Sequence, residues 1–261
     1  MPHRLVLAAF ALVVGLIALG RLARPVPTVP AAVAPQVAAE PGTPAPARRL
    51  GPLQATLDAP PVGTPSIDLE ARLAVRRRIE REGSRVFLDS MLAVTDSVVV
   101  RWSDRIPRLI FVRFVPDSTL PDWRAALEDA RVGMLAWDGN EAGYDLRETS
   151  ENSADITVQW TSMLNAPHQL GLTGVSWGSD GVIRSATMTL ALRQNPDSLL
   201  VPAPFRRRVA AHEFGHALGL PHSERDSDVM FRSSPIASPS RRDRATLQLL
   251  YAVTPGPIRT P

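Results

Sequence analysis

The 261-residue chain contains no cysteine. Without thiols it can form no disulfide framework, iron–sulfur cluster or zinc ribbon, and no thiol nucleophile can act in it. A lipoprotein anchor, which requires a cysteine, is excluded for the same reason. Histidine is also scarce, because the whole chain has five: His3, His168, His212, His216 and His222. Any chemistry that depends on imidazole must therefore come from this small set.

Lysine is absent as well, so all 29 basic residues are arginines, and they are balanced by 26 acidic residues. The formal net charge is only +3, and the isoelectric point of about 10.3 reflects the high pKa of guanidinium groups, not a large basic surplus. Aromatic residues make up 5% of the chain, so no basic stripe with interleaved stacking side chains is present. We therefore predict no nucleic-acid partner.

The first 24 residues have the layout of an export signal, with an uncharged apolar run over 5–19 between Arg4 and Arg21. A membrane-spanning helix needs about 20 apolar residues, so this shorter run favours a cleaved signal peptide over a retained signal anchor. The anchor stays open as an alternative because Arg21 and Arg24 resist translocation. We predict an exported protein (secreted, periplasmic or tethered outside the cytoplasm) with membrane contact only through such an anchor.

Two further segments precede the main domain. Residues 25–65 alternate proline with alanine, valine and threonine, which predicts an extended linker. Residues 66–100 carry apolar side chains at helical spacing, with Ser66 as a cap and an interruption at Gly83. We interpret this stretch as a packed helical pair that forms a pre-domain segment, and an inhibitory pro-segment is the alternative.

The main domain is expected over residues 101–254, followed by a tail at 255–261. Strand and helix patterns alternate along it and just before it, and two strands, a helix, three strands and two helices follow in order. This order predicts an α+β fold with α/β layering. Strands are expected at 98–102, 108–115, 143–148, 155–160 and 183–192, and helices at 121–137, 204–218 and 241–251, the last capped by Ser240.

The sequence AAHEFGHALGLPH at 210–222 carries the strongest chemical signal. Four positions along an α-helix turn through about 400°, so His212 and His216 share one face and their imidazoles can meet at one point. Glu213 is rotated by about 100° from His212, so it can flank a metal ion without binding it. Gly219 permits a turn that stops the helix and swings the chain back, which delivers His222 as a third ligand.

Three histidines suit a catalytic zinc ion, which usually takes three protein ligands and leaves one position to water. In a chain of this composition, a random match to His-Glu-x-x-His-x-x-Gly-x-x-His is expected on the order of 10⁻⁵ times. Two alternatives, core histidines and a purely structural zinc, account less well for the adjacent Glu213. We therefore predict one catalytic Zn²⁺ held by His212, His216 and His222, with Glu213 as the catalytic residue.

These residues resemble the extended zinc motif of the metzincin endopeptidases, and in particular the matrixin type. HSERDSDVM at 222–230 is similar to the matrixin approach to the Met-turn, which implies that Met230 forms a hydrophobic floor and is not a ligand. The resemblance implies a metzincin-like catalytic domain with a twisted mixed sheet, an active-site helix and a C-terminal helix. The last helix is similar to its matrixin counterpart at Ser240, Asp243, Leu250 and Tyr251.

The chain departs from matrixins in residues 161–184. Many matrixins carry a second zinc and calcium ions in a His- and Asp-rich loop there, whereas this stretch offers only His168 and Asp180 besides carbonyls and hydroxyls. We predict no second zinc, and calcium at Asp180 has no support beyond that one carboxylate. Latency through a cysteine bound to the zinc is impossible, because the chain has no thiol.

The sequence therefore predicts a monomeric zinc-dependent endopeptidase, in which Glu213 acts as the general base on a zinc-activated water. An extended polypeptide substrate is expected to add to the strand at 183–192, whose counterpart in the resembled fold is an exposed edge. Two alternatives stay open: a catalytically silent zinc-binding or adhesive module, and a zinc amidase that acts on cell-wall peptides.

Overall fold

The structure is a computed structural model, and it describes residues 69–105, 108–139, 142–166 and 168–259. All of these lie within one compact unit, Arg49–Pro261. The predicted export signal, the linker and the cap at Ser66 lie outside the described residues. Among the described residues, no helix is both long enough and apolar enough to cross a membrane.

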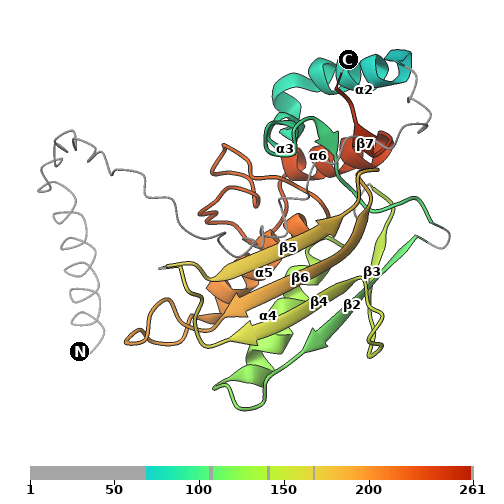
Figure 1. The fold of residues 1–261 in the computed structure, drawn as a ribbon. Coiled ribbons are helices and arrows are strands. Elements are labelled where there is room, and N and C mark those ends of the chain that lie inside the picture. The colour runs from blue at the N-terminus through green and yellow to red at the C-terminus, as the bar shows by residue number, and fades with distance from the viewer. Residues whose placement is uncertain (1–68, 106–107, 140–141, 167, 260–261) are drawn as a thin grey trace, which may run out of the picture. The chain divides into compact units, whose positions relative to one another are not determined.

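A five-stranded mixed sheet organises the unit, with strand order β3-β2-β4-β6-β5 (Figure 1). The first four strands in this order run parallel to one another, and β5 pairs antiparallel to β6 at the edge. The α+β fold with a mixed sheet is therefore confirmed. The strands are β2 (Leu109–Val115), β3 (Asp145–Glu148), β4 (Ile156–Thr161), β5 (Gly171–Trp177) and β6 (Ile183–Ala191).

The strand β5 differs from the sequence prediction in two ways. No strand was expected at 171–177, and the strand at 183–192 was expected to be the exposed edge. In the structure β6 lies inside the sheet, between β4 and β5, so the edge prediction was wrong. Gly171 and Gly174 weaken the strand signal, because glycine is depleted in strands, and this hid β5 in the sequence.

Two helices cover one face of the sheet: α4 (Trp123–Leu135) and α5 (Ala203–Ala217) (Figure 1). The sheet turns apolar side chains such as Ile156, Val158 and Met188 towards this face, where all three are buried. Gly133 of α4 makes the close helix packing possible, since a Cβ built there would lie 2.5 Å from Cβ of Ala210. The active-site helix and the sheet are thus joined in one core.

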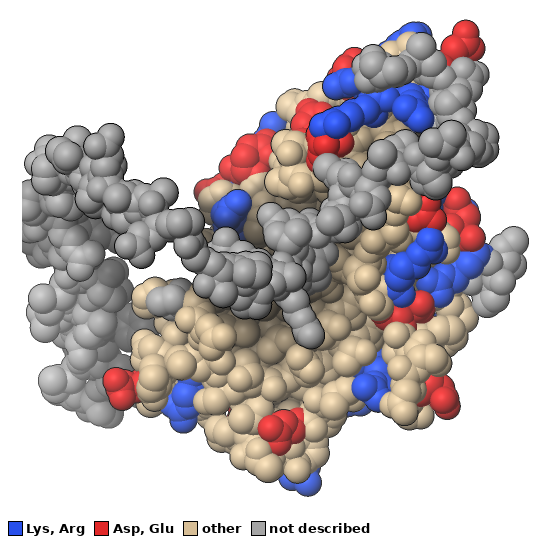
Figure 2. All heavy atoms as spheres, in the orientation of Figure 1, with Lys and Arg blue, Asp and Glu red and all other residues tan. Residues whose placement is uncertain are grey.

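Among the described residues, no helix covers the opposite face of the sheet (Figure 1). Along β4 and β6 this face presents hydroxyl and amide side chains, and Gln159 of β4 donates a hydrogen bond to Thr189 of β6 (3.0 Å). In Figure 2 the visible part of this face is largely uncharged, and arginine and acidic side chains are interspersed around its rim.

The remaining elements gather at one end of the sheet (Figure 1). The predicted helical pair is present, and Gly83 interrupts it with φ = 48°. The last helix has the predicted Ser240 cap, completed by Asp243 in a capping box. These elements are α2 (Leu69–Glu82), η1 (Gly83–Arg85), α3 (Leu88–Val94), β1 (Val98–Val99), α6 (Arg241–Ala252) and β7 (Gly256–Pro257).

The pre-domain segment shares its core with the main domain. Ile79, Phe87 and Met91 are buried in the same hydrophobic cluster as Leu247 of α6. The guanidinium of Arg242 donates hydrogen bonds to the carbonyls of Ser84 (3.0 Å) and Val86 (3.0 Å). The short strand β1, at the end of the pre-domain segment, also pairs antiparallel with β7 in the tail, so the two segments that flank the main domain are joined. The boundary at residue 101 and the pro-segment alternative stay predictions.

Candidate metal centre

Three histidines converge at the end of α5. One ring nitrogen of each lies within 4.8 Å of the others, and in the described part of the chain this is the one group of three or more such side chains that could hold a metal ion. Nε2 of His216 lies 3.1 Å from Nε2 of His212 and 3.2 Å from Nε2 of His222. These are the three residues that the motif predicts as ligands.

The chain path that brings them together is the one expected from the motif. The helix α5 ends at Ala217, and Gly219 follows with φ = 97°, a conformation that glycine adopts without strain. The amide of Leu220 donates to the carbonyl of Gly215 (2.9 Å), so the chain folds back over the last helical turn. Any side chain on Gly219 would also crowd the carbonyl of Val100, 2.8 Å from a built Cβ. His222 is thereby carried beside His216.

Backbone carbonyls orient two of the rings. Nδ1 of His212 lies 2.7 Å from the carbonyl oxygen of Val229, and Nδ1 of His216 lies 2.8 Å from that of Leu220. A carbonyl only accepts, so each Nδ1 carries the proton and each Nε2 is left with a lone pair. Two lone pairs that face each other at 3.1 Å repel unless a cation lies between them. This donor set therefore fits a metal ion.

The spacing also fits zinc. Zinc–nitrogen bonds of about 2.0–2.1 Å in a tetrahedron place the nitrogens about 3.3 Å apart, close to the two measured separations. Burial lowers the pKa of His212, lowers that of His216 to about 3 and lowers that of His222 to about 4. At His216 and His222, repulsion between a protonated ring and the nearby histidines and Arg232 lowers the pKa further. All three rings are therefore neutral near pH 7, which is the form that binds metals.

Met230 lies beneath the cluster and is fully buried. Its Sδ would be 2.2 Å from a Cβ built on Gly215, so the glycine one residue before His216 lets the sulfur approach the helix. The amide of Ser223 donates to the carbonyl of Met230 (2.9 Å) and joins the turn to the residue after His222. These contacts agree with the role of a hydrophobic floor that the resemblance implies for Met230.

Two buried carboxylates, Asp243 and Asp228, hold the Met-turn in place, and the sequence did not indicate either of them as a site residue. Asp243 accepts hydrogen bonds from the amides of Val229 (2.8 Å) and Met230 (3.3 Å). Asp228 accepts from Ser223, Ser240 and Arg242. Burial alone would raise the pKa of Asp228, but these hydrogen bonds and the charge of Arg242 hold it below its usual value. Asp243 and Asp228 thus fix the loop that carries the Val229 carbonyl to His212.

Glu213 lies beside the histidines and contacts the edge strand. The residue is 6% exposed, and Oγ1 of Thr173 donates a hydrogen bond to its Oε2 (2.6 Å). Burial raises the pKa of Glu213 to about 7, although the hydrogen bond from Thr173 opposes the shift. A carboxylate with a pKa near the working pH is suited to proton transfer. Thr173 was missed because the strand that carries it was missed.

Two residues considered from sequence lie outside the cluster. His168 occupies the turn before β5 with φ = 64°. Asp180 caps the amide of Val182 (3.0 Å) and forms an ion pair with Arg184 (2.6 Å). Because its carboxylate is engaged in this way, Asp180 offers no support for a calcium site.

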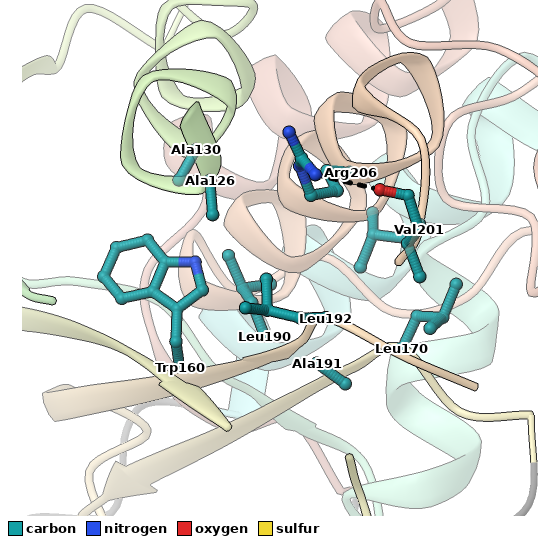
Figure 3. A pocket seen from close by; sticks show the side chains of 10 residues that line it. Ala126, Ala130, Trp160, Leu170, Leu190, Ala191, Leu192, Val201 and Arg206 are labelled. Atoms are coloured by element: carbon teal, nitrogen blue, oxygen red, sulfur yellow. Dashed lines mark hydrogen bonds between the residues drawn. The ribbon is translucent and has the colours of Figure 1, made fainter. Parts of the chain in front are cut away.

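An apolar pocket lies between α4, α5 and the ends of β4 and β6 (Figure 3). Its one charged lining residue is Arg206, whose guanidinium donates to the carbonyl of Val201 (2.9 Å) and to buried Asp129 (2.7 Å). The other lining residues are Ala126, Ala130, Trp160, Leu170, Leu190, Ala191, Leu192, Val201 and Val209. None of the predicted site residues lines this pocket, so the reactive groups lie elsewhere.

Comparison with known families agrees with the geometry. Residues 205–252 match the matrixin family model. The chain carries a matrixin-type zinc motif. The matched segment runs from α5 through the Met-turn to the end of α6, and it includes every histidine of the cluster. The predicted resemblance is thus confirmed over this segment, and the match supports a zinc metallopeptidase family. No curated protein gave a match.

Proposed function

We propose that this protein is a zinc-dependent endopeptidase that cleaves extended polypeptides outside the cytoplasm. The observation that carries the proposal is the convergence of three histidine Nε2 atoms, two of them left unprotonated by the carbonyls that face Nδ1, with the buried carboxylate of Glu213 on the same helix. His212, His216 and His222 would hold one zinc ion. When bound, zinc acts as a Lewis acid that lowers the pKa of a coordinated water towards 7 and polarises the scissile carbonyl.

Glu213 is the general base in this proposal. Its carboxylate accepts a proton from the attacking water and returns that proton to the leaving amine as the peptide bond breaks. The side chain cannot act as a fourth ligand in place of water, because it extends from the helix about 100° away from His212 and is held by Thr173. Val229 and Leu220 keep the rings of His212 and His216 in the metal-binding tautomer through their carbonyls.

The edge strand β5 offers a place for an extended substrate. It is antiparallel to β6, and no strand pairs with its other side among the described residues. A peptide can add there through main-chain hydrogen bonds, which recognise the backbone more than the side chains. This replaces the strand at 183–192, expected from sequence, as the proposed substrate strand.

The substitution Glu213→Ala tests the proposal. The full chain loaded with zinc should keep one zinc per molecule, while cleavage of casein falls to background, because the ligands remain and the base is lost. Undiminished cleavage of casein by this variant would contradict the mechanism. Inactivity of both wild type and variant, with zinc still bound, would favour the silent zinc-binding or adhesive module.

A second assay separates the endopeptidase from the zinc amidase. Wild-type protein is offered casein and peptidoglycan peptides at equal concentration, and products are identified by mass spectrometry. Cleavage of casein at internal bonds supports the endopeptidase, and cleavage of the cell-wall peptides alone supports the amidase.

A further inference from the structure

Two residues of β5 contact the carboxylate of Glu213 from one face of the strand. Thr173 lies 40 positions before Glu213, and its Oγ1 approaches both Oε2 (2.6 Å) and the main-chain carbonyl of Glu213 (3.3 Å). A hydroxyl has one proton to donate, and the shorter distance assigns it to the carboxylate. Thr173 therefore holds one defined oxygen of Glu213 in place.

Gly171 provides the room for this contact. A Cβ built on Gly171 would lie 2.4 Å from Oε1 of Glu213 and 2.7 Å from its carboxyl carbon. Residues two apart in a strand point to the same face, so Gly171 and Thr173 both meet α5, while Leu172 between them faces away and is 51% exposed. The carboxylate thus occupies the space that a side chain at residue 171 would fill, and it accepts a hydrogen bond from the hydroxyl of Thr173.

We propose that Thr173 is a positioning residue that orients the carboxylate of Glu213 for proton transfer, in space provided by Gly171. The inference rests on the proposed function, in which Glu213 is the general base. A buried carboxylate without this donor would be free to rotate about its last bonds, and its oxygen would be misplaced relative to the attacking water. Small misplacements of a reacting group can reduce a rate by up to about 100-fold.

The same strand is the proposed site of substrate addition, so Thr173 links substrate binding to the base. The backbone of Thr173 is part of the sheet edge with which a peptide would pair. Its side chain points towards α5 and sets the orientation of the carboxylate of Glu213. A peptide seated on β5 would therefore lie in a fixed relation to Glu213. Loss of the hydroxyl should affect the chemical step and leave the pairing edge intact.

The test compares three substitutions at one position in the zinc-loaded full chain. Thr173→Val removes the hydroxyl and keeps a side chain of similar volume. Thr173→Ala removes the hydroxyl and leaves a smaller side chain, whereas Thr173→Ser keeps the hydroxyl. We expect kcat to fall by about 10- to 100-fold in both Val and Ala variants, with KM within about 2-fold and zinc stoichiometry unchanged. The Ser variant should recover kcat to within about 3-fold of wild type.

A matched control makes the same chemical change on the neighbouring strand. Thr187 of β6 is exposed and is paired across the strands with Gly174, so Thr187→Val alters a sheet threonine that does not contact Glu213. This variant should keep wild-type kcat and KM. An equal loss of kcat in Thr187→Val would show that the sheet change itself impairs the enzyme, and it would overturn the positioning role.

Further outcomes decide the inference separately from the proposed function. Wild-type kcat in Thr173→Val and Thr173→Ala, a change confined to KM, or no recovery in Thr173→Ser would overturn it. In a Glu213→Gln background the additional Thr173→Val change should not lower the residual rate, since the base it orients is gone. If Glu213→Ala itself retains full activity, the proposed function fails. If Glu213→Ala is inactive while the Thr173 variants are fully active, only the positioning role fails.

Discussion

The two sides of the candidate metal centre are held in different ways. On the histidine side, main-chain carbonyls of Val229 and Leu220 orient the rings, and both carbonyls lie within 17 residues of the histidines they serve. On the glutamate side, one hydroxyl on a separate strand, 40 positions away in sequence, holds the carboxylate. A carbonyl is present whatever the residue, whereas a hydroxyl is lost in a single substitution. The first arrangement depends on the path of the chain and the second on the identity of Thr173.

Removal of a ligand should have the largest effect and should separate the two sides. His216→Ala deletes the central ring of the cluster, so we expect both bound zinc and peptidase activity to be lost. Mutation of a residue that only hydrogen-bonds to a metal ligand commonly lowers metal affinity or activity by about 10- to 100-fold. Loss of a ligand itself should therefore lower the activity by more than about 100-fold. Zinc content measured by atomic absorption beside the activity would check this.

Glu213→Ala is the matched control for His216→Ala, because it should lose activity and keep zinc. Equal zinc content in the two variants would break the division of the site into a metal-binding side and a proton-transfer side.

The support beneath the Met-turn should be the next most sensitive feature. Arg242 is 10% exposed in its side chain and forms an ion pair with Asp228 (2.8 Å), which is 2% exposed. Arg242→Met leaves that carboxylate buried without its counter-charge, so the free energy of unfolding should fall by about 3–5 kcal/mol. Urea unfolding of the zinc-free protein measures the loss.

The exposed arginine at 225 supplies a control, since its ion pair with Glu224 lies on the surface. Arg225→Met should change the free energy of unfolding by less than about 1 kcal/mol. A similar loss in both variants would contradict the special role of the buried pair.

A larger residue at position 215 tests whether the packing of Met230 against α5 affects the binding of zinc by the histidines. In Gly215→Ala the new methyl group meets Sδ of Met230 at 2.2 Å and the ring of Trp137 at 2.9 Å. We expect a loss of about 1–3 kcal/mol in the free energy of unfolding together with weaker zinc binding, because Met230 must move. Calorimetric zinc titration and thermal unfolding would measure the two effects.

Met230→Leu serves as the comparison, since a volume-conserving change in a core usually costs less than about 1.5 kcal/mol. Unchanged zinc affinity in Gly215→Ala would show that the packing of the Met-turn does not set the geometry of the ligands.

Acidification should reduce the stabilisation that Asp228 gives to the Met-turn. The folded-state pKa of Asp228 is held below its usual value, so its ionised form stabilises the fold above about pH 4, the ordinary pKa of an aspartate. This contribution is lost as the pH falls through the lowered pKa. The difference in the free energy of unfolding between wild type and Asp228→Asn should therefore shrink from pH 7 to pH 3, as measured with urea. A difference that grows on acidification would contradict the assignment.

The smallest effect is expected at Leu172, on the outward face of the same strand as Thr173. Leu172→Thr replaces an exposed side chain that does not contact Glu213, so the free energy of unfolding should change by less than about 0.5 kcal/mol, with zinc content and kcat unchanged. Steady-state kinetics with a casein-derived peptide would test it. A loss of kcat as large as in Thr173→Val would show that β5 acts on Glu213 as a whole strand and not through one hydroxyl.

Much of the fold was predictable from local patterns. The helices α4, α5 and α6 and four of the five strands of the sheet were predicted from apolar periodicity and caps, with their ends shifted by a few residues. The strand β5 was not, because two glycines mask its pattern, although Thr173, Val175 and Trp177 do alternate along it. Its place at the edge depends on pairing with β6, and such pairing is not contained in the periodicity of either segment.

The sequence by itself determined the histidine set, because a helix with a four-residue spacing and a glycine turn places His212, His216 and His222 together through local geometry. Tertiary structure alone decided which strand is the edge, which hydroxyl meets Glu213 and which buried charges support the Met-turn. Those contacts join residues as far apart as Arg242 and Ser84, and they exist only once the sheet and helices have packed into one core. Local geometry repeats wherever the motif occurs, whereas long-range contacts depend on the whole fold.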